Sequence, residues 1–98
     1  MTVLALLDLR LKPEVLDAAP AVMSQLLEAT RGFDGCLGVE VTIDVDDPTH
    51  VVFVEKWDTI EHDDAYRAFR ATPAGASGLG DLLAGPPVLT RLTVADDI

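Results

Sequence analysis

The hydrophobic and polar positions along the chain follow two periods, one typical of β-strands and one typical of helices. Residues 2–11 form a leucine-rich, β-branched run that ends at Lys12-Pro13, and residues 35–45 alternate strictly between apolar and polar side chains. Together with residues 50–57 and 88–94, these segments predict four strands.

Two other segments carry helical signals. Residues 13–31 place apolar side chains on one stripe at helical spacing, although Pro20 predicts a kink or a break because it lacks a backbone N–H. Asp58 and Glu61 match an aspartate version of the capping box, which predicts a second helix that runs to about Ala71.

Residues 72–87 are rich in Gly, Ala and Pro and predict a connector with a short helical piece at 81–84. The resulting order is strand, helix, strand, strand, helix, strand. Two strand–helix–strand crossovers that share an antiparallel sheet predict an α+β, ferredoxin-like βαββαβ fold. Residues 1–98 are too few for much more than one domain, so the sequence predicts a single one.

The strand at 50–57 carries apolar side chains on both of its faces. Val52 and Val54 lie on one side, and Val51, Phe53 and Trp57 lie on the other. Helices cover only one face of a ferredoxin-like sheet, so the second apolar face needs a partner, most simply a second copy of the chain.

A turn at residues 46–49 sets the expected register of the two central strands. A four-residue loop pairs positions whose numbers sum to 95. The pairs expected on one face are Thr42 with Phe53, Glu40 with Glu55, and Gly38 with Trp57.

Two of these pairs suggest a site, and each has a structural alternative. A glycine opposite an indole either accommodates the ring of Trp57 in the core or leaves room for a cavity beside it. Two facing carboxylates either join an ion-pair network, with Arg10 and Arg91 as partners, or supply a general acid or base with a raised pKa.

The second predicted helix places His62, Tyr66 and Phe69 on one stripe. The stripe is either the edge of the core or part of a site, to which it would add a titratable imidazole and a phenol donor. The acids of the run EHDD at 61–64 point to different faces of a helix, so they fit the helix dipole better than a metal site.

The charge of the chain excludes some classes of partner. The net charge is −10 with only seven basic residues, which argues against nucleic acid and against an anionic membrane surface. No apolar run is long enough to span a bilayer. Cys36 is the only cysteine, so no internal disulfide forms and we expect a cytoplasmic protein.

Several short motifs together resemble one known family. The segment Gly35–Glu40, the turn Asp46-Asp47-Pro48 and the strand end Val54–Asp58, followed by Glu61 and Tyr66, have the order and spacing of the antibiotic biosynthesis monooxygenase family. The resemblance covers almost the whole chain. It implies a homodimer of α+β barrels with a pocket between the sheet and the helices of each subunit.

The resemblance also implies an activity. Some members oxidise polycyclic phenols with O₂ and no cofactor, using a dry cavity, a base and donors for a developing oxyanion. The expected catalytic residues are Glu55, His62 and Tyr66, with Glu40 as another possible base. The expected substrate-binding residues are Trp57, Phe53, Glu40, Gly38 and Phe69.

The chain also departs from the family pattern. Many members carry histidines where this chain has Tyr66 and Ala74, and the haem-degrading branch uses a histidine where it has Ala76. Haem degradation is therefore not expected. The sequence favours a cofactor-independent monooxygenase that acts on an aromatic or quinone-type small molecule. A dimeric small-molecule binding protein, and an isomerase or cyclase on the same barrel, are the alternatives.

Overall fold

One four-stranded antiparallel sheet organises the chain, and the computed structural model describes all of residues 1–98. The strands lie side by side in the order β2-β3-β1-β4, which is the ferredoxin-like arrangement, and this confirms the predicted fold class. The strand bounds are Val3–Arg10 for β1, Cys36–Asp44 for β2, Asp47–Trp57 for β3 and Val88–Thr93 for β4.

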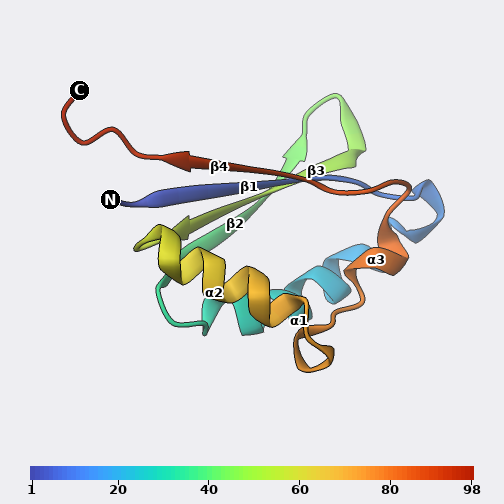
Figure 1. Cartoon of the computed structure of the whole chain (residues 1–98). Helices are drawn as coiled ribbons and strands as arrows, with labels where there is room; N and C mark the ends of the chain where they lie inside the picture. Colours follow the sequence, from blue (N-terminus) through green and yellow to red (C-terminus); the bar gives the residue numbers. More distant parts are fainter.

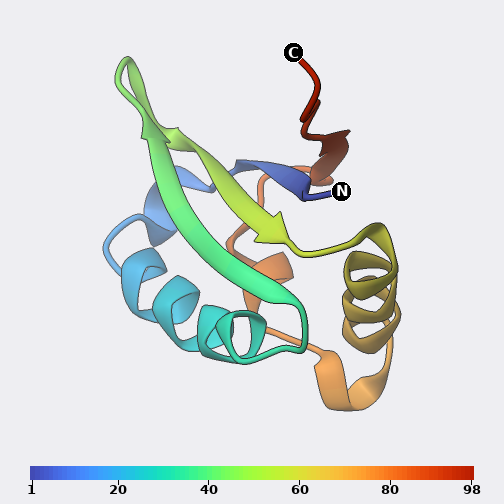
Figure 2. The ribbon, with the colours of Figure 1, turned by 90° about the vertical axis from the view of Figure 1, so that its left-hand side faces the viewer.

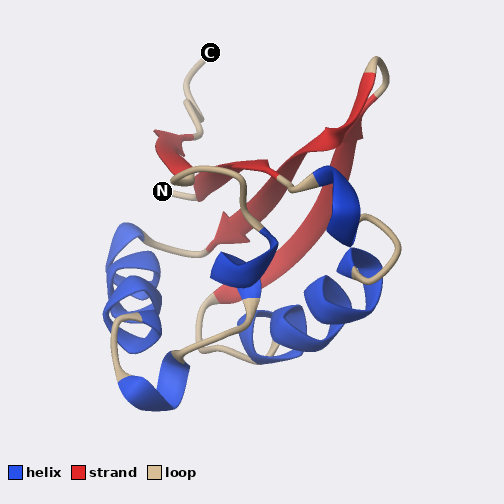
Figure 3. Cartoon of the chain, turned by 90° about the vertical axis from the view of Figure 1, so that its right-hand side faces the viewer, coloured by secondary structure: helices blue, strands red, loops and turns tan.

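All the helices lie on one face of this sheet (Figures 1 and 3). None of them combines the length and the hydropathy that crossing a bilayer requires. The three α-helices span Ala19–Arg31 (α1), Ile60–Arg70 (α2) and Leu79–Leu82 (α3), and two short 3₁₀ turns span Pro13–Val15 and Pro73–Gly75.

The first helix is shorter than the sequence predicted. Residues 13–15 form a separate 3₁₀ turn, and α1 begins only at Ala19, with Pro20 in its first turn. The first N–H groups of a helix have no intrahelical partner, so a proline costs no hydrogen bond there. Pro20 therefore splits the predicted helix instead of kinking it.

The second helix begins one residue later than predicted. The cap is Thr59, whose Oγ1 accepts a hydrogen bond from the backbone N–H of His62 at 3.2 Å, and not Asp58. The third helix, α3, starts two residues before the predicted piece at 81–84. Strand β4 follows the prediction closely.

The predicted register of the β2–β3 hairpin was wrong by one residue. Asp44 pairs with Asp47 across a two-residue turn, and Ile43 then pairs with Val51, so the ladder skips residues 48–50 of β3. Pro48 lies in the skipped segment and has no N–H to donate to a ladder. The predicted four-residue loop missed this irregularity.

The apolar core lies between the sheet and the helices. Strand β3 contributes Val51, Phe53 and Trp57, none of which is more than 1% exposed. Met23 and Leu27 of α1 pack in one cluster with Val51 and Phe53, and Trp57 packs in a second cluster with Tyr66 of α2. This face of β3 is the one that the helices cover, so the helices are anchored to the middle of the sheet.

The opposite face of the sheet has no cover within the chain (Figure 2). Strand pairing places Leu6 beside Val54 and Leu4 beside Leu92 on this face. Val52 lies on the same side as Val54, and Leu92 is 45% exposed. The prediction that strand 50–57 is apolar on both faces is therefore confirmed, and one of those faces is open.

A polar cluster occupies the end of this open face near the hairpin turn. The ring of His50 lies between two carboxylates, with Nδ1 2.8 Å from Asp44 Oδ2 and Nε2 2.9 Å from Asp8 Oδ2. These hydrogen bonds raise the pKa of His50. Both ring nitrogens can donate only in the imidazolium form, and in that form the cluster joins β1, β2 and β3 through one positive charge.

A glycine before β2 supplies the first testable prediction. Gly35 has φ +85°, and a Cβ built there would lie 2.1 Å from the ring of His62. We expect Gly35→Ala to lower the free energy of unfolding by about 1–3 kcal/mol, because of backbone strain and displacement of the imidazole.

Urea unfolding of Gly35→Ala measures this effect. Gly80→Ala is the matched control, since Gly80 lies in α3 and its added Cβ would meet nothing within 4 Å. We expect that control to be neutral or slightly more stable than the wild type. Equal stability of the two variants would show that the turn at Gly35 relaxes without cost.

Candidate functional site

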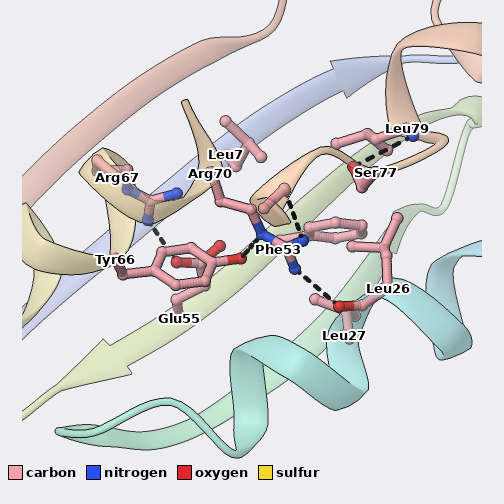
Figure 4. Close-up of a pocket in the computed structure, with 11 residues that line it drawn as sticks. Leu7, Leu26, Leu27, Phe53, Glu55, Tyr66, Arg67, Arg70, Ser77 and Leu79 are labelled. Atoms are coloured by element: carbon pink, nitrogen blue, oxygen red, sulfur yellow. Dashed lines mark hydrogen bonds and ion pairs between the residues drawn. The ribbon is translucent and has the colours of Figure 1, made fainter. Parts of the chain in front are cut away.

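A pocket of about 170 Å³ lies between the covered face of the sheet and helices α1 and α2 (Figure 4). Its floor comes from β1 and β3, its sides come from the two helices, and one end is closed by the segment after α2. The lining residues are Leu7, Leu26, Leu27, Phe53, Glu55, Tyr66, Arg67, Arg70, Gly75, Ser77 and Leu79.

Glu55 is the carboxylate of this pocket, and its side chain is only 2% exposed. Its Oε1 accepts hydrogen bonds from Trp57 Nε1 at 3.1 Å and from Arg67 Nη2. Its Oε2 has no partner in the chain. Every fully enclosed side-chain oxygen or nitrogen of the protein does have a partner, so Oε2 is accessible from the pocket.

Burial controls the protonation of this carboxyl group. Desolvation raises the pKa of Glu55 above its ordinary value, although the Arg67 guanidinium and the hydrogen bond from Trp57 act in the opposite direction. Two hydrogen-bond donors on Oε1 thus stabilise the charged form of Glu55, while its buried surroundings disfavour that form. A carboxylate in this state is a stronger base than one in water.

Arg67 connects Glu55 to a second buried acid. Its Nε donates to Asp63 Oδ1 at 3.1 Å, and Asp63 is fully buried. Arg91 of β4 donates to the other oxygen of Asp63, also at 3.1 Å. This chain of charges joins β3, α2 and the outer strand β4, so it fixes the helix that carries Tyr66 and Arg70.

Aromatic rings pack behind the carboxylate. The rings of Trp57 and Tyr66 lie 4.9 Å apart at 34°, and Phe33 meets both of them edge-on. Trp57 itself does not line the pocket. It orients Glu55 through its N–H and supports the Tyr66 ring from behind.

The Tyr66 hydroxyl forms the polar side of the pocket together with two other residues. It lies 2.6 Å from Thr30 Oγ1 and accepts a hydrogen bond from Arg70 Nε at 2.7 Å. When Thr30 is the donor of the first contact, the Tyr66 proton is free to point at a bound molecule. The phenol can therefore serve as a hydrogen-bond donor inside the pocket.

The structure brings together three of the residues that the sequence selected. Phe53, Glu55 and Tyr66 all line the pocket. His62 lies outside it, near the start of α2, with its Nδ1 2.7 Å from Thr59 Oγ1. Phe69 faces a neighbouring hollow of about 380 Å³ beside α1.

The expected pairs of Glu40 with Glu55 and of Gly38 with Trp57 do not form. Glu40 pairs with Val54 and is exposed on the open face, because the register differs by one residue. The same one-residue difference places Gly38 opposite Lys56, and a bulge between Cys36 and Gly38 then brings Cys36 opposite Trp57. Glu40 and Gly38 therefore line a hollow on the open face and not the pocket that contains Glu55.

Two arginines that line the pocket, Arg67 and Arg70, were not among the residues predicted from the sequence. Arg67 pairs with Glu55, whereas the expected partners Arg10 and Arg91 pair with Asp47 and with Asp63 and Asp64. Helical spacing contained a usable signal, since Arg67 follows Asp63 by four residues, and Arg70 follows Tyr66 by four.

The fold and the pocket define an α+β protein whose site lies between a ferredoxin-like sheet and its helices. Residues 2–76 match the family model described as antibiotic biosynthesis monooxygenase. The match covers about three quarters of the chain, so the chain belongs to the antibiotic biosynthesis monooxygenase family. The resemblance noted in the sequence is thereby confirmed.

Solved structures agree with this fold. Rv0793 from Mycobacterium tuberculosis is 22% identical with a TM-score of 0.78, and the match covers 99% of this chain and 98% of that one. A conserved protein from Methanosarcina mazei Go1 is 17% identical with a TM-score of 0.80, and the coverage is 94% and 91%.

A third structure, named antibiotic biosynthesis monooxygenase, is 23% identical with a TM-score of 0.77, and the match covers 97% of this chain and 99% of that one. No protein with a curated description matches the chain. At these identities the likeness establishes the fold, while the function has to be argued from the pocket.

Glu55 gives the site a testable pH dependence. Its raised pKa means that the folded protein holds this proton more tightly than the unfolded chain does. Glu55 therefore adds to the free energy of unfolding at pH values below its raised pKa. This contribution is lost as the pH rises through that pKa. We expect the free energy of unfolding of the wild type, relative to Glu55→Gln, to fall as the pH rises from 4.5, the ordinary pKa, through the raised pKa of Glu55.

The measurement is urea unfolding of both proteins across that range. Glu61→Gln is the control, because it removes an exposed carboxylate near the start of α2. A difference between wild type and Glu55→Gln that stays constant with pH would show that burial does not perturb Glu55.

Proposed function

We propose that this pocket is the active site of a cofactor-independent monooxygenase that oxidises a small aromatic or quinone-type molecule with O₂. The observation that carries the proposal is the accessible Oε2 of Glu55, a buried carboxylate in a pocket that Phe53 and Tyr66 also line. Family membership supports monooxygenase chemistry but names no substrate.

The chemistry needs a base and donors more than it needs a cofactor. Glu55 Oε2 removes a proton from an activated C–H of the substrate, and the resulting carbanion reduces O₂ and forms a C–O bond with it. Glu55 returns its proton to the resulting peroxide anion, which gives a hydroperoxide. The second C–H bond and the O–O bond of the hydroperoxide then break, and the C–H proton leaves with the hydroxide as water. A CH₂ group and O₂ thus become a C=O group and H₂O, and the substrate supplies all four electrons.

The other pocket residues take supporting roles in this proposal. Tyr66 donates to the oxyanion that develops on the ring as the C–H is deprotonated, and Arg67 holds Glu55 in position. Phe53 and Leu7 exclude water from the reacting atoms. Trp57 acts as a positioning residue through its hydrogen bond to Glu55.

A binding protein without chemistry is the second candidate. The observation that favours it is the ion pair between Glu55 and Arg67, which stabilises the carboxylate and weakens it as a base. An isomerase or a cyclase would use the same carboxylate without O₂. Oxygen consumption therefore separates the monooxygenase from both alternatives.

The central prediction concerns O₂ uptake by the purified, metal-free protein with hydroquinones and other single-ring phenols as substrates. We expect uptake with at least one of them and a loss of about 10²–10⁴-fold in kcat/KM in Glu55→Gln, because the variant has no base. In the wild type, log kcat/KM should rise with pH through the raised pKa of Glu55 and then level off.

Glu61→Gln is again the matched control, and its kcat/KM should equal that of the wild type. Tight binding without O₂ uptake would favour the binding protein, and substrate rearrangement without O₂ uptake would favour the isomerase or cyclase. Uptake that is unchanged in Glu55→Gln would reject Glu55 as the base.

We also propose that two chains associate through the open face of the sheet. Homodimers are typical of the family, and the face that carries Leu4, Leu6, Val52 and Val54 is apolar and uncovered by the chain itself. Burying such a face removes apolar surface from water. A cytoplasmic location stays a prediction from the lone cysteine.

The expected mass in solution is about 21 kDa, twice the 10.5 kDa of one chain. Val54→Lys should shift the mass to that of the monomer, because it places a charge in the centre of the apolar face. Val45→Lys is the control and should remain dimeric, because Val45 lies in the hairpin turn and is 97% exposed. Light scattering after gel filtration measures all three, and a monomeric wild type would reject the proposed dimer.

A further inference from the structure

The side chain of Arg70 reaches from α2 across the pocket to α1 (Figure 4). It makes four hydrogen bonds, and every acceptor is electrically neutral. They are Tyr66 Oη at 2.7 Å, the Leu26 carbonyl at 2.8 Å, Thr30 Oγ1 at 3.1 Å and the Gly75 carbonyl at 3.2 Å. A guanidinium has five N–H groups, so one N–H on Nη1 remains without a partner in the chain.

Arg70 differs in this respect from the neighbouring arginines. Arg67 and Arg91 each contact carboxylates, whereas no carboxylate oxygen lies within 4.0 Å of Arg70. The charged residues that line the pocket are Glu55, Arg67 and Arg70. Arg67 pairs with Glu55 and with Asp63, so Arg70 is the one charged side chain of the pocket without a partner of opposite charge.

An unbalanced, partly buried cation attracts an anion strongly, because water screens it poorly. The attraction must be local, since the whole chain has a net charge of −10 and repels anions at long range. A preference of the pocket for an anion therefore has to come from Arg70 and not from the general field of the protein.

The size of the pocket limits what the anion can be. Its volume of about 170 Å³ is close to that of an engineered cavity of about 150 Å³ that holds benzene, and it is below the roughly 300 Å³ of ordinary ligand pockets. Its walls include Leu7, Leu27 and Phe53, which suit the faces of a flat ring. One six-membered ring fits this volume.

We propose that the pocket takes a single-ring aromatic molecule with one ionised oxygen substituent, a carboxylate or a phenolate, and that Arg70 selects it. The inference rests on the proposed function, since it assigns a substrate class to the same pocket. Arg70 bonds the charged oxygen through its remaining Nη1 N–H, the ring lies against Phe53, and Glu55 Oε2 faces the ring.

The test compares two single-ring probes of similar size, benzoate and benzyl alcohol, at pH 7. Trp57 is the only tryptophan and contacts both Tyr66 and Glu55, so its fluorescence reports on binding, and calorimetry gives the Kd values. We expect the wild type to bind benzoate about tenfold or more tightly than benzyl alcohol, because a charge-assisted hydrogen bond forms only with the anion.

Arg70→Gln should remove this preference, because neither probe then gains a charge-assisted hydrogen bond, and Arg70→Lys should retain part of it. Arg10→Gln is the matched control, because it removes one positive charge from an exposed side chain on β1, outside the pocket. Its preference should equal that of the wild type. Equal Kd values for the two probes in the wild type, or a preference that survives in Arg70→Gln, would overturn the proposal.

A second measurement works even if Arg70→Gln fails to fold. In ¹H–¹⁵N spectra of the wild type, the Arg70 Nε–H signal should shift with benzoate and not with benzyl alcohol, and the absence of that shift would overturn the proposal. The outcomes separate the two claims. A benzoate preference without O₂ uptake keeps the anion site and rejects the monooxygenase, and O₂ uptake without the preference rejects only the anion site.

Discussion

The burial of Glu55 beneath helix α2 is the interaction on which the rest of the site depends. A carboxylate on the covered face of a sheet is unfavourable unless a cation and hydrogen-bond donors accompany it. Arg67 provides the cation, and Asp63 and Arg91 extend the ion pairing to β4. The helix must therefore sit where Arg67 reaches β3, and this position also brings Tyr66 and Arg70 to the pocket.

Much of the fold could be predicted because the apolar side chains recur in the sequence at the clear spacings of strands and of helices. The four strands, the two main helices and the ferredoxin-like order all follow from alternation, helical spacing and turn residues. The register of β2 against β3 could not be predicted, because it depends on a two-residue turn and a skip of residues 48–50. A slip of one residue moves every side chain to the other face, and for that reason Glu40 was placed wrongly.

The candidate site was predicted in part for a related physical reason. Phe53, Glu55 and Trp57 share one face of a single strand, which strand alternation places regardless of what the strand pairs with. Arg70 depends on how α2 sits relative to α1, and its main-chain acceptors, Leu26 and Gly75, lie 44 and 5 residues away. Such contacts leave no periodic trace in the sequence, so only the structure identifies them.

The two oxygens of the Glu55 carboxylate have different surroundings. Oε1 takes both donors and anchors the side chain, while Oε2 remains available to a ligand. In the proposals made above, the two arginines of the pocket match two anions, one that belongs to the protein and one that a ligand brings. An anion bound at Arg70 would raise the pKa of Glu55 further, since like charges disfavour ionisation. The proposed anion site and the proposed base would then be coupled through their charges, because each changes the free energy of ionising the other.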